Sequence, residues 1–485
     1  MDDSIRAKTV IWGVGAVLLT CSALRAGEGP DDYVSRPSIS DDGRFVAFLT
    51  RATNLLDYVD PESDGLTNAL WIDRETRRIF NAQQIGGPSP KSYYGAANNH
   101  SLSRDGEWIV FNSSNSFIEG NDGVTNVFVS AVRLRADSIA PPTKFAMISR
   151  TPEGDPGNGN SKVPAISGNG RYVIFKSNAT NLTGDTVNGT DYHHYLVDRD
   201  LDENGIFDEE GTGNTSITLL GGTTLKAAID DGKRPSFSSD GMRALFFADS
   251  GARLYNNGVI SETNAIPGGL TPEGSNTLTT SRIYPAGNAS DIGTYFRYRN
   301  SLSQTFPFPD RGEGAISSNG ASFILTSTES DMGGSDTNGH RDIYLINRLQ
   351  SKATLISSGV GGEANNDSGR TPFEDRTFDM SADGMFIAFA TEATNMGFAD
   401  NNGSSSDIII IDRNTGERDR VEKDVTPDPD VIDPGGPNPV LTTSLKKKIK
   451  KLKKKQKAAK TKGNSAKAKR FAKKIKKLNK MLRSL

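Results

Sequence analysis

A short phrase recurs six times along the chain and constrains its fold more than any other feature. It reads Ser-x-Asp/Asn-Gly-x followed by an apolar run, and its copies begin at Ser40, Ser103, Ser167, Ser238, Ser317 and Ser381. Successive copies are 63, 64, 71, 79 and 64 residues apart. A period of this length is typical of a repeat architecture, in which each period folds into the same unit.

One period can be divided into four short strands. Residues 36–40 and 45–48 are two β-prone runs joined by the turn-forming sequence at 41–43, and residues 70–74 and 78–80 form a second such pair. Four antiparallel strands per period are typical of a propeller blade. The sequence therefore predicts an all-β chain that folds as a β-propeller of six four-stranded blades.

A seventh blade remains an alternative. Residues 289–296 are a degenerate copy of the phrase and its strand, but they begin less than half a period before the copy at Ser317. That interval leaves little room for four strands, and six blades are expected.

The repeats also resemble a known family. Arg36-Pro-Ser-Ile-Ser-Asp-Asp-Gly-Arg44, followed by Ala52-Thr-Asn-Leu55 and Asp73-Arg74, resembles the TolB-type, WD-like propeller repeat of bacterial exported proteins. The resemblance covers about residues 32–422. It implies a propeller but no activity, because the same blades serve binding proteins and enzymes. TolB itself has an α/β domain before the propeller, which is not found here, so its partners are not implied.

The N-terminus has the order of an export signal. Arg6 and Lys8 precede an apolar run at 10–19, and small residues follow through Ala23 and Ala26. Residues 1–26 are predicted to be a signal peptide, which places the protein in the periplasm or outside the cell. A lipid anchor at Cys21 and an uncleaved anchor remain alternatives.

The net charge of −2 conceals an acidic body and a basic tail. Residues 445–485 hold 18 Lys, 2 Arg and no acidic residue, so the remaining chain holds 37 basic and 59 acidic side chains, a net charge of −22. Residues 423–444 are a Pro/Gly-rich linker. In the tail, apolar residues recur at helical spacing on both sides of Gly463-Asn464, which predicts a Lys-rich amphipathic helical hairpin.

The tail lysines repel one another, so we expect the tail to order on an anionic partner. The candidates are a membrane surface, an anionic envelope polymer, nucleic acid and the acidic propeller itself, and nucleic acid is less favoured because the chain is predicted to be exported. A disordered, solubilising tail is the alternative. The predicted contact residues are Lys447, Lys450, Lys454, Lys469, Arg470, Lys473 and Lys477.

One acidic loop, at residues 198–210, interrupts the period. Its oxygen donors alternate around a glycine as in a Ca²⁺-binding loop, with Asp200, Asp202, Asn204 and Asp208 supplying side chains and Ile206 its carbonyl. The bidentate glutamate expected at position twelve is replaced by Gly211. The loop is either a structural Ca²⁺ site or an acidic hairpin tip.

Motifs for catalysis are scarce. The chain has four histidines, and it contains no Gly-x-Ser-x-Gly, His-Glu-x-x-His or phosphate-binding glycine motif. We therefore predict a monomeric, non-enzymatic propeller scaffold that binds a protein or an envelope component. The alternatives are a propeller hydrolase that uses channel-mouth carboxylates on an extracellular glycosyl or ester substrate, and a purely structural envelope component.

Overall fold

The computed structural model describes residues 27–424 and Lys453, with gaps at 57–66, 86–90, 93–96, 115–122, 134–143, 210–212, 228–233, 239, 250, 263–264, 271–275, 283–291, 299–300, 307–313, 318–320, 329–335, 348–351, 370–376, 401 and 404. The predicted signal peptide, nearly all of the linker and the seven predicted contact residues of the tail lie outside the described residues. Within the described part, no helix is long and apolar enough to cross a membrane.

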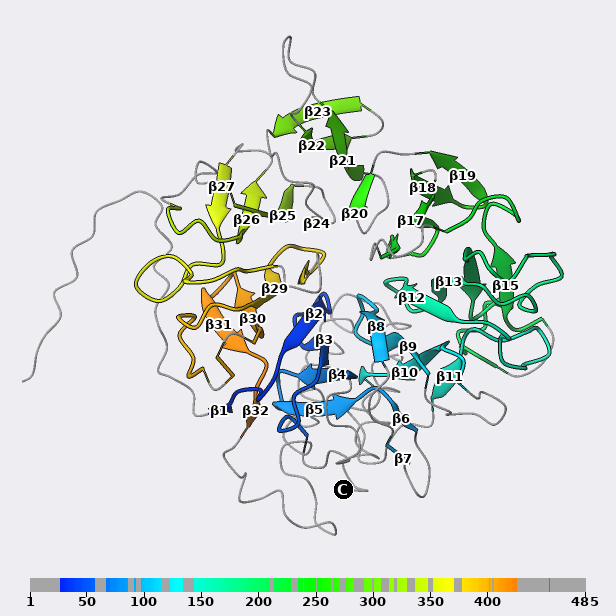
Figure 1. The fold of residues 1–485 in the computed structure, drawn as a ribbon, viewed down its shortest axis with the longest axis horizontal. Helices are drawn as coiled ribbons and strands as arrows, with labels where there is room; N and C mark the ends of the chain where they lie inside the picture. The colour runs from blue at the N-terminus through cyan, green and yellow to red at the C-terminus, as the bar shows by residue number, and fades with distance from the viewer. Residues whose placement is uncertain are drawn as a thin grey trace, which may run out of the picture.

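Four-stranded antiparallel sheets stand around a common middle, with the first strands of the sheets nearest that middle (Figure 1). Six of these sheets contain the repeated phrase, and they are numbered here as blades 1 to 6. Blade 1 consists of β2 (Val34–Ile39), β3 (Phe45–Thr50), β4 (Asn68–Asp73) and β5 (Arg78–Asn81). Blade 2 consists of β8 (Ala97–Leu102), β9 (Trp108–Ser113), β10 (Asn126–Ala131) and β11 (Phe145–Met147). Blade 3 consists of β12 (Ser161–Ile166), β13 (Tyr172–Ser177), β14 (His193–Asp198) and β15 (Ser216–Leu219).

The other three phrase-bearing blades follow the same order of strands. Blade 4 consists of β16 (Ser236–Phe237), β17 (Arg243–Ala248), β18 (Gly251–Asn256) and β19 (Val259–Glu262). Blade 5 consists of β24 (Gly314–Ile316), β25 (Ser322–Ser327), β26 (Asp342–Asn347) and β27 (Lys352–Leu355). Blade 6 consists of β28 (Phe378–Met380), β29 (Phe386–Thr391), β30 (Asp407–Asp412) and β31 (Glu417–Arg420).

A further four-stranded sheet without the phrase lies between blades 4 and 5. It consists of β20 (Ala265–Leu270), β21 (Asn276–Arg282), β22 (Ile292–Tyr298) and β23 (Ser301–Phe306). The prediction of a propeller built from four-stranded blades is confirmed, and this sheet occupies the region in which a seventh blade was left open. Residues 292–296 of the degenerate stretch lie in its third strand, β22, and residues 289–291 lie outside the described residues.

The hydrophobic core is divided among the interfaces between neighbouring blades. Between blades 1 and 2, the rings of Trp71 and Phe80 stack with centroids 4.1 Å apart, and Phe111 packs in the same cluster. Similar clusters join blades 2 and 3, blades 5 and 6, and blades 6 and 1. Blades 1, 2 and 6 therefore each bury apolar side chains against both of their neighbours.

The two ends of the described propeller meet beside blade 1. The short strand β1 (Gly27–Glu28) pairs antiparallel with β32 (Lys423–Asp424), and the two lie side by side in Figure 1. Arg77 of blade 1 forms ion pairs with Asp419 (2.6 Å) and Glu422 (3.0 Å), which lie near the end of the described propeller. A second two-stranded pair, β6 (Gln84–Ile85) with β7 (Lys91–Ser92), follows blade 1.

Candidate functional sites

The repeated phrase forms the hairpin between the first and second strands of each blade. In blade 1, Ser40 Oγ donates to Asp42 Oδ1 (2.7 Å) and accepts from the Phe45 amide (3.0 Å), and Asp42 Oδ1 accepts the Arg44 amide (3.1 Å). The hairpins of blades 2, 3, 4 and 6 repeat these bonds. The serine and aspartate thus act as turn caps, as their spacing predicts.

The glycine of the phrase also serves a contact between blades. Gly170 has φ +77°, and a Cβ at this position would lie 2.4 Å from the Trp108 ring of the preceding blade. A Cβ on Gly43 would likewise lie 2.5 Å from the ring of Phe386 in blade 6. A side chain is therefore excluded both by the backbone conformation and by the neighbouring ring. The glycine fixes how closely adjacent blades approach.

An arginine at the end of the third strand completes the same contact. In blade 3, Arg199 Nη1 donates to the carbonyl of Gly170, and its guanidinium carbon lies 4.3 Å from the centroid of the Trp108 ring. The guanidinium carbon of Arg133 lies 4.8 Å from the centroid of the Phe45 ring, and that of Arg74 lies 5.8 Å from the centroid of the Phe386 ring. These are cation–π contacts between neighbouring blades. The sequence shows the recurring Asp/Asn-Arg ending, but not the blade that it contacts.

The phrase hairpins are linked to one another at one end of the first strands. The Asp41 amide donates to the Arg104 carbonyl (2.8 Å), the Asp105 amide donates to the Gly168 carbonyl (3.0 Å), and Asp41 Oδ1 accepts the Ala382 amide (2.8 Å). These bonds join the hairpins of blades 6, 1, 2 and 3 around one end of the middle of the propeller, which is called the mouth below.

Three carboxylates gather at this mouth. Burial raises the pKa of Asp41, the nearby Asp379 and Asp383 raise it further, and Arg104 opposes them. Asp41 also lies 3.6 Å from Arg104, and its side chain remains 39% exposed. Asp379 Oδ2 accepts the Ile39 amide (3.1 Å). Asp41 is thus the carboxyl group at the mouth that combines a raised pKa with access to solvent.

The acidic loop that interrupts the period folds back onto blade 2. Arg199 is fully buried, and its guanidinium carbon lies 4.3 Å from the centroid of the Trp108 ring and 4.8 Å from that of the Phe207 ring. Its Nε donates to Asp208 Oδ1 (2.9 Å), and Nη2 pairs with the other carboxylate oxygen. Arg199 therefore stabilises both the interface between blades 2 and 3 and the end of the loop.

The predicted Ca²⁺ ligands are placed by hydrogen bonds within the loop. Asp200 accepts the amides of Asn204 and Gly205 (both 3.0 Å), and Asn204 Nδ2 donates to Asp202 Oδ2 (2.7 Å). Asp208 faces Arg199 as described above, and the side chain of Ile206 is 48% exposed. Within the described ranges, no three His, Cys, Asp or Glu side chains are grouped as metal ligands. Calcium binding remains a prediction.

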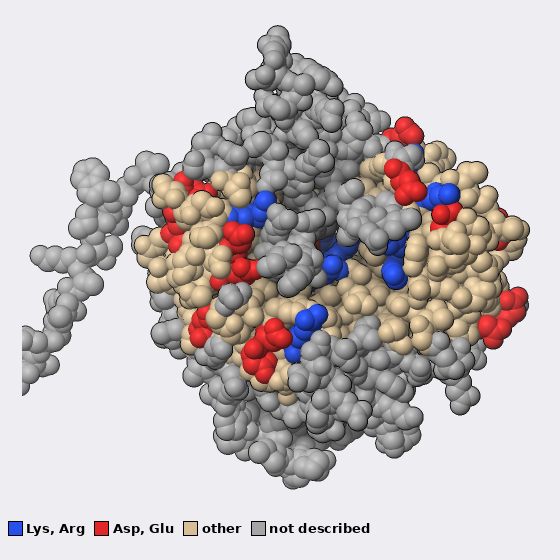
Figure 2. Space-filling view, viewed as in Figure 1, with Lys and Arg blue, Asp and Glu red and all other residues tan. Residues whose placement is uncertain are grey.

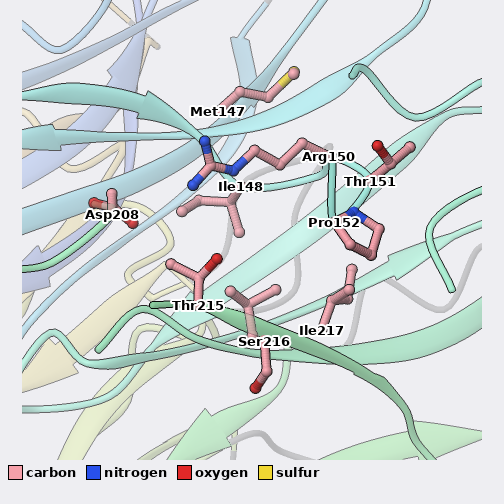
Figure 3. A pocket seen from close by; sticks show the side chains of 10 residues that line it. Met147, Ile148, Arg150, Thr151, Pro152, Asp208, Thr215, Ser216 and Ile217 are labelled. Carbon is pink, nitrogen blue, oxygen red and sulfur yellow. The ribbon is translucent and has the colours of Figure 1, made fainter. Parts of the chain in front are cut away.

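A cleft of about 250 Å³ lies between blades 2 and 3, next to this loop. Met147, Ile148 and Arg150 lie on the blade 2 side, and Thr215 and Ile217 lie across from them (Figure 3). Asp208, Val197, Ser216, Thr151 and Pro152 complete the lining. Among the described residues, the Arg150 guanidinium has no hydrogen bond or ion pair. The cleft thus combines apolar walls with the Arg150 cation, several hydroxyl groups and the Asp208 carboxylate, which pairs with Arg199.

Sequence reasoning did not find this cleft. Its walls come from segments some 60 residues apart, and the residues that form them carry no motif. The one available signal was the interruption of the period at residues 198–210, because the end of that loop supplies Asp208 to the cleft.

Comparisons with known proteins identify no family. The sequence matches no protein-family model, and no curated protein matches it. Similar solved structures include the β-propeller domain of the Trilobed protease from Pyrococcus furiosus, at 10% identity and TM-score 0.45, covering 81% of this chain and 96% of that chain. Oligogalacturonate lyase from Vibrio parahaemolyticus is similar at 13% identity and TM-score 0.44, covering 80% and 91% of the two chains.

TolB from Acinetobacter baumannii is also similar, at 11% identity and TM-score 0.31, with 80% of this chain and 62% of that chain covered. The chain spans about half (52%) of the length of the acylaminoacyl peptidase from Pyrococcus horikoshii, at 12% identity and TM-score 0.42. Similarities at this level assign no function, so the function proposed below depends on the residues of this chain.

Proposed function

We propose that the protein is an exported, non-catalytic propeller scaffold that binds a protein or envelope component and docks on an anionic surface through its basic tail. The cleft between blades 2 and 3 carries this proposal. Its apolar walls and the cation of Arg150 suit a partner segment that presents an apolar side chain next to a carboxylate.

The hydrogen bonds made by the repeated phrase support a role as a scaffold. The Ser and Asp side chains that recur most often cap turns, and the arginines fasten blades to one another. These repeated polar groups therefore build the propeller, whereas the cleft includes Asp208 of the loop that interrupts the period. Residues that differ from the repeat are the ones available for recognition.

The charge of the tail supports docking on an anionic surface. Twenty basic side chains within residues 445–485 follow a body with a net charge of −22. Binding to anionic vesicles or polymers should therefore fall steeply as salt concentration rises. The acidic body would repel the same surface, which assigns the attraction to the tail.

The tail is tested in the full-length protein. Changing Lys447, Lys450, Lys454, Lys469, Arg470, Lys473 and Lys477 to Gln should weaken binding to vesicles that contain anionic lipid, while leaving the melting temperature unchanged. Seven matched Lys→Gln changes elsewhere in the chain serve as the control. Equal retention of the two variants on the vesicles would refute docking through the tail.

The cleft is tested separately. Ile217→Arg should place a second cation in the cleft and remove binding of a short peptide probe with a C-terminal Leu and its free carboxylate, and Arg150→Gln should weaken that binding. Ile206→Arg, at an exposed position on the same loop, is the matched control. If all three variants bind the peptide as the unaltered protein does, the cleft is not the recognition site.

A hydrolase remains the second candidate, and Asp41 is the observation that favours it. A carboxyl group with a raised pKa at a channel mouth has the property of a general acid. We would assay a panel of glycosyl, ester and lactone substrates with the unaltered protein and with Asp41→Asn. Asp240→Asn, in the phrase of blade 4, is the control. Turnover that is lost in Asp41→Asn and retained in Asp240→Asn would replace the scaffold proposal.

A further inference from the structure

Among the described strands, the outermost strand of each blade pairs on one side only. A charged residue on such a strand discourages pairing with another chain. Four outermost strands carry one: Arg78 in β5, Glu262 in β19, Lys352 in β27 and Glu417 in β31. The outermost strands of blades 2 and 3, β11 and β15, carry none, and neither does β23. Of these three, β11 and β15 flank the cleft, because Met147 and Ile217 line it.

The register of β15 shows which of its backbone groups are turned outward. The amide of Leu220 donates to the carbonyl of His194 (2.8 Å), which fixes the alternation of hydrogen bonds along the antiparallel pair β14–β15. Every second residue of β15 bonds to β14 in this way. The amides and carbonyls of Ile217 and Leu219 therefore point away from β14, and within the described ranges no strand pairs with that side of β15.

The same register directs one face of β15 toward the cleft. Ile217 lies opposite Val197, so both side chains point to the same face of blade 3, and both pack with Ile148 of blade 2 in one apolar cluster. Figure 3 shows Ile217 across the cleft from Ile148. A strand that paired with β15 would alternate its own side chains in the same way, so every second side chain would lie over the cleft.

Arg150 supplies a cation for the end of such a strand. Its guanidinium has no hydrogen bond or ion pair among the described residues, whereas the Asp208 carboxylate in the same lining is already paired with Arg199. A carboxylate of a partner would therefore complement Arg150. On the visible face, the surface over blade 3 consists mostly of uncharged residues, with Asp and Glu near its outer edge (Figure 2). An otherwise uncharged segment fits this surface.

We propose that β15 binds its partner by strand addition: an extended segment of a partner protein pairs with the amides and carbonyls of Ile217 and Leu219 as a fifth strand of blade 3. Its alternate apolar side chains lie in the cleft, and its carboxylate contacts Arg150. This inference rests on the proposed recognition by the cleft and adds how the partner is held. The strand β15 is favoured over β11 because it has four residues against three and so offers the longer ladder.

Peptides with methylated amides test the pairing on the unaltered full-length protein. The probe is a fluorescent peptide of alternating Thr and Val that ends in Leu with a free carboxylate. In a bound strand, the amides of every second residue face β15 and the others face solvent. Two peptides are compared, each methylated on one of these two sets of amides. One of them should bind at least about tenfold more weakly than the other, which is about 1.4 kcal/mol.

Two substitutions at one position test the pairing from the protein side. Ile217→Ala removes the side chain and keeps the amide, whereas Ile217→Pro also removes the amide that points away from β14. Because that amide takes no part in the bonds to β14, the two variants should have similar melting temperatures. Ile217→Pro should bind the probe at least about tenfold more weakly than Ile217→Ala. The methylated peptides need no variant, so they decide the question if Ile217→Pro unfolds.

The outcomes separate strand addition from the function on which it rests. If Ile217→Arg removes binding but both methylated peptides bind equally well, the cleft recognises its partner without strand pairing, and this inference alone is wrong. Absence of binding by the unmethylated probe would refute both the inference and the cleft as the recognition site. A dimer of the unaltered protein that Ile217→Pro abolishes and Ile217→Ala retains would assign the edge to a second copy and overturn the proposal of a separate partner.

Discussion

The guanidinium of Arg199 lies 4.3 Å from the ring of Trp108, although the two residues belong to different blades. The ring of Phe207 also lies against this guanidinium, at 4.8 Å, with its centroid 5.7 Å from that of Trp108, and Asp208 pairs with the same guanidinium. The contact joins three features that are separate in the sequence: the phrase of blade 2, the third strand of blade 3 and the loop that interrupts the period. The loop that interrupts the period is thereby held against the repeated part of the propeller.

Replacing Arg199 should test this fastening. Arg199→Met leaves the side chain of Asp208 only 10% exposed and without its cation, and we expect the free energy of unfolding to fall by about 3–5 kcal/mol. Arg133→Met, at the equivalent but more exposed position of blade 2, should cost about 1 kcal/mol or less. Urea denaturation measures both. Equal losses in the two variants would show that the loop contact adds nothing to the repeated one.

The phrase glycines should differ from other glycines with positive φ. Gly170→Ala requires the Trp108 ring to move, whereas a Cβ on Gly123 (φ +77°) would meet nothing within 4 Å. We expect Gly123→Ala to cost about 1 kcal/mol through the backbone alone, and Gly170→Ala to cost about 2 kcal/mol more. Thermal unfolding of the two variants gives the comparison, and similar values for both would contradict an inter-blade role for the glycine.

Buried histidines should make stability depend on pH. Burial, with Lys176 and His193 nearby, lowers the pKa of His194 to about 3. Between pH 6.5 and 3 the unfolded chain therefore binds a proton at this position that the folded chain does not, so the free energy of unfolding falls as pH falls. His194→Phe, which keeps a ring against Phe246, should reduce the loss between pH 7.5 and 5.5 by about 1 kcal/mol. If the free energy of unfolding depends on pH in the same way in both proteins, His194 is not the group responsible.

Calcium should stabilise the loop at residues 198–210 if it binds there. Millimolar Ca²⁺ is expected to raise the melting temperature, and Asp200→Ala combined with Asp202→Ala should abolish that response. The readout is the difference with and without Ca²⁺, since Asp200 also accepts two loop amides and its loss affects the loop directly. Mg²⁺ at the same concentration is the control. A Ca²⁺ response that survives in the double variant would place the ion elsewhere.

Local features of the fold could be predicted from the sequence because they depend on nearby residues. The strands at β2, β3, β4 and β5 and the capping of the turn by Ser40 and Asp42 follow from alternation and turn chemistry within one period. The sheet β20–β23 was harder to find because it lacks the phrase. Blade 4 ends at Glu262, so the long stretch between the phrase copies at Ser238 and Ser317 contains a further sheet after blade 4.

Contacts between blades could not be predicted in the same way. Arg199 and Asp208 are near neighbours, yet the pairing of Arg199 with Trp108 depends on how two separate sheets pack. The recurring arginine after the third strand was visible as a pattern, but its partner ring could be assigned only once the order of blades in space was known.

The pairing of β1 with β32 has a mechanical consequence. The residues that lead to the basic tail leave the propeller at Asp424, so tension on a surface-bound tail would reach the ring first at two residue pairs. Arg77 would bear the load next, through its contacts with Asp419 and Glu422. The seam between the first and last blades is therefore the place where pulling, rather than heating, should begin to open the protein.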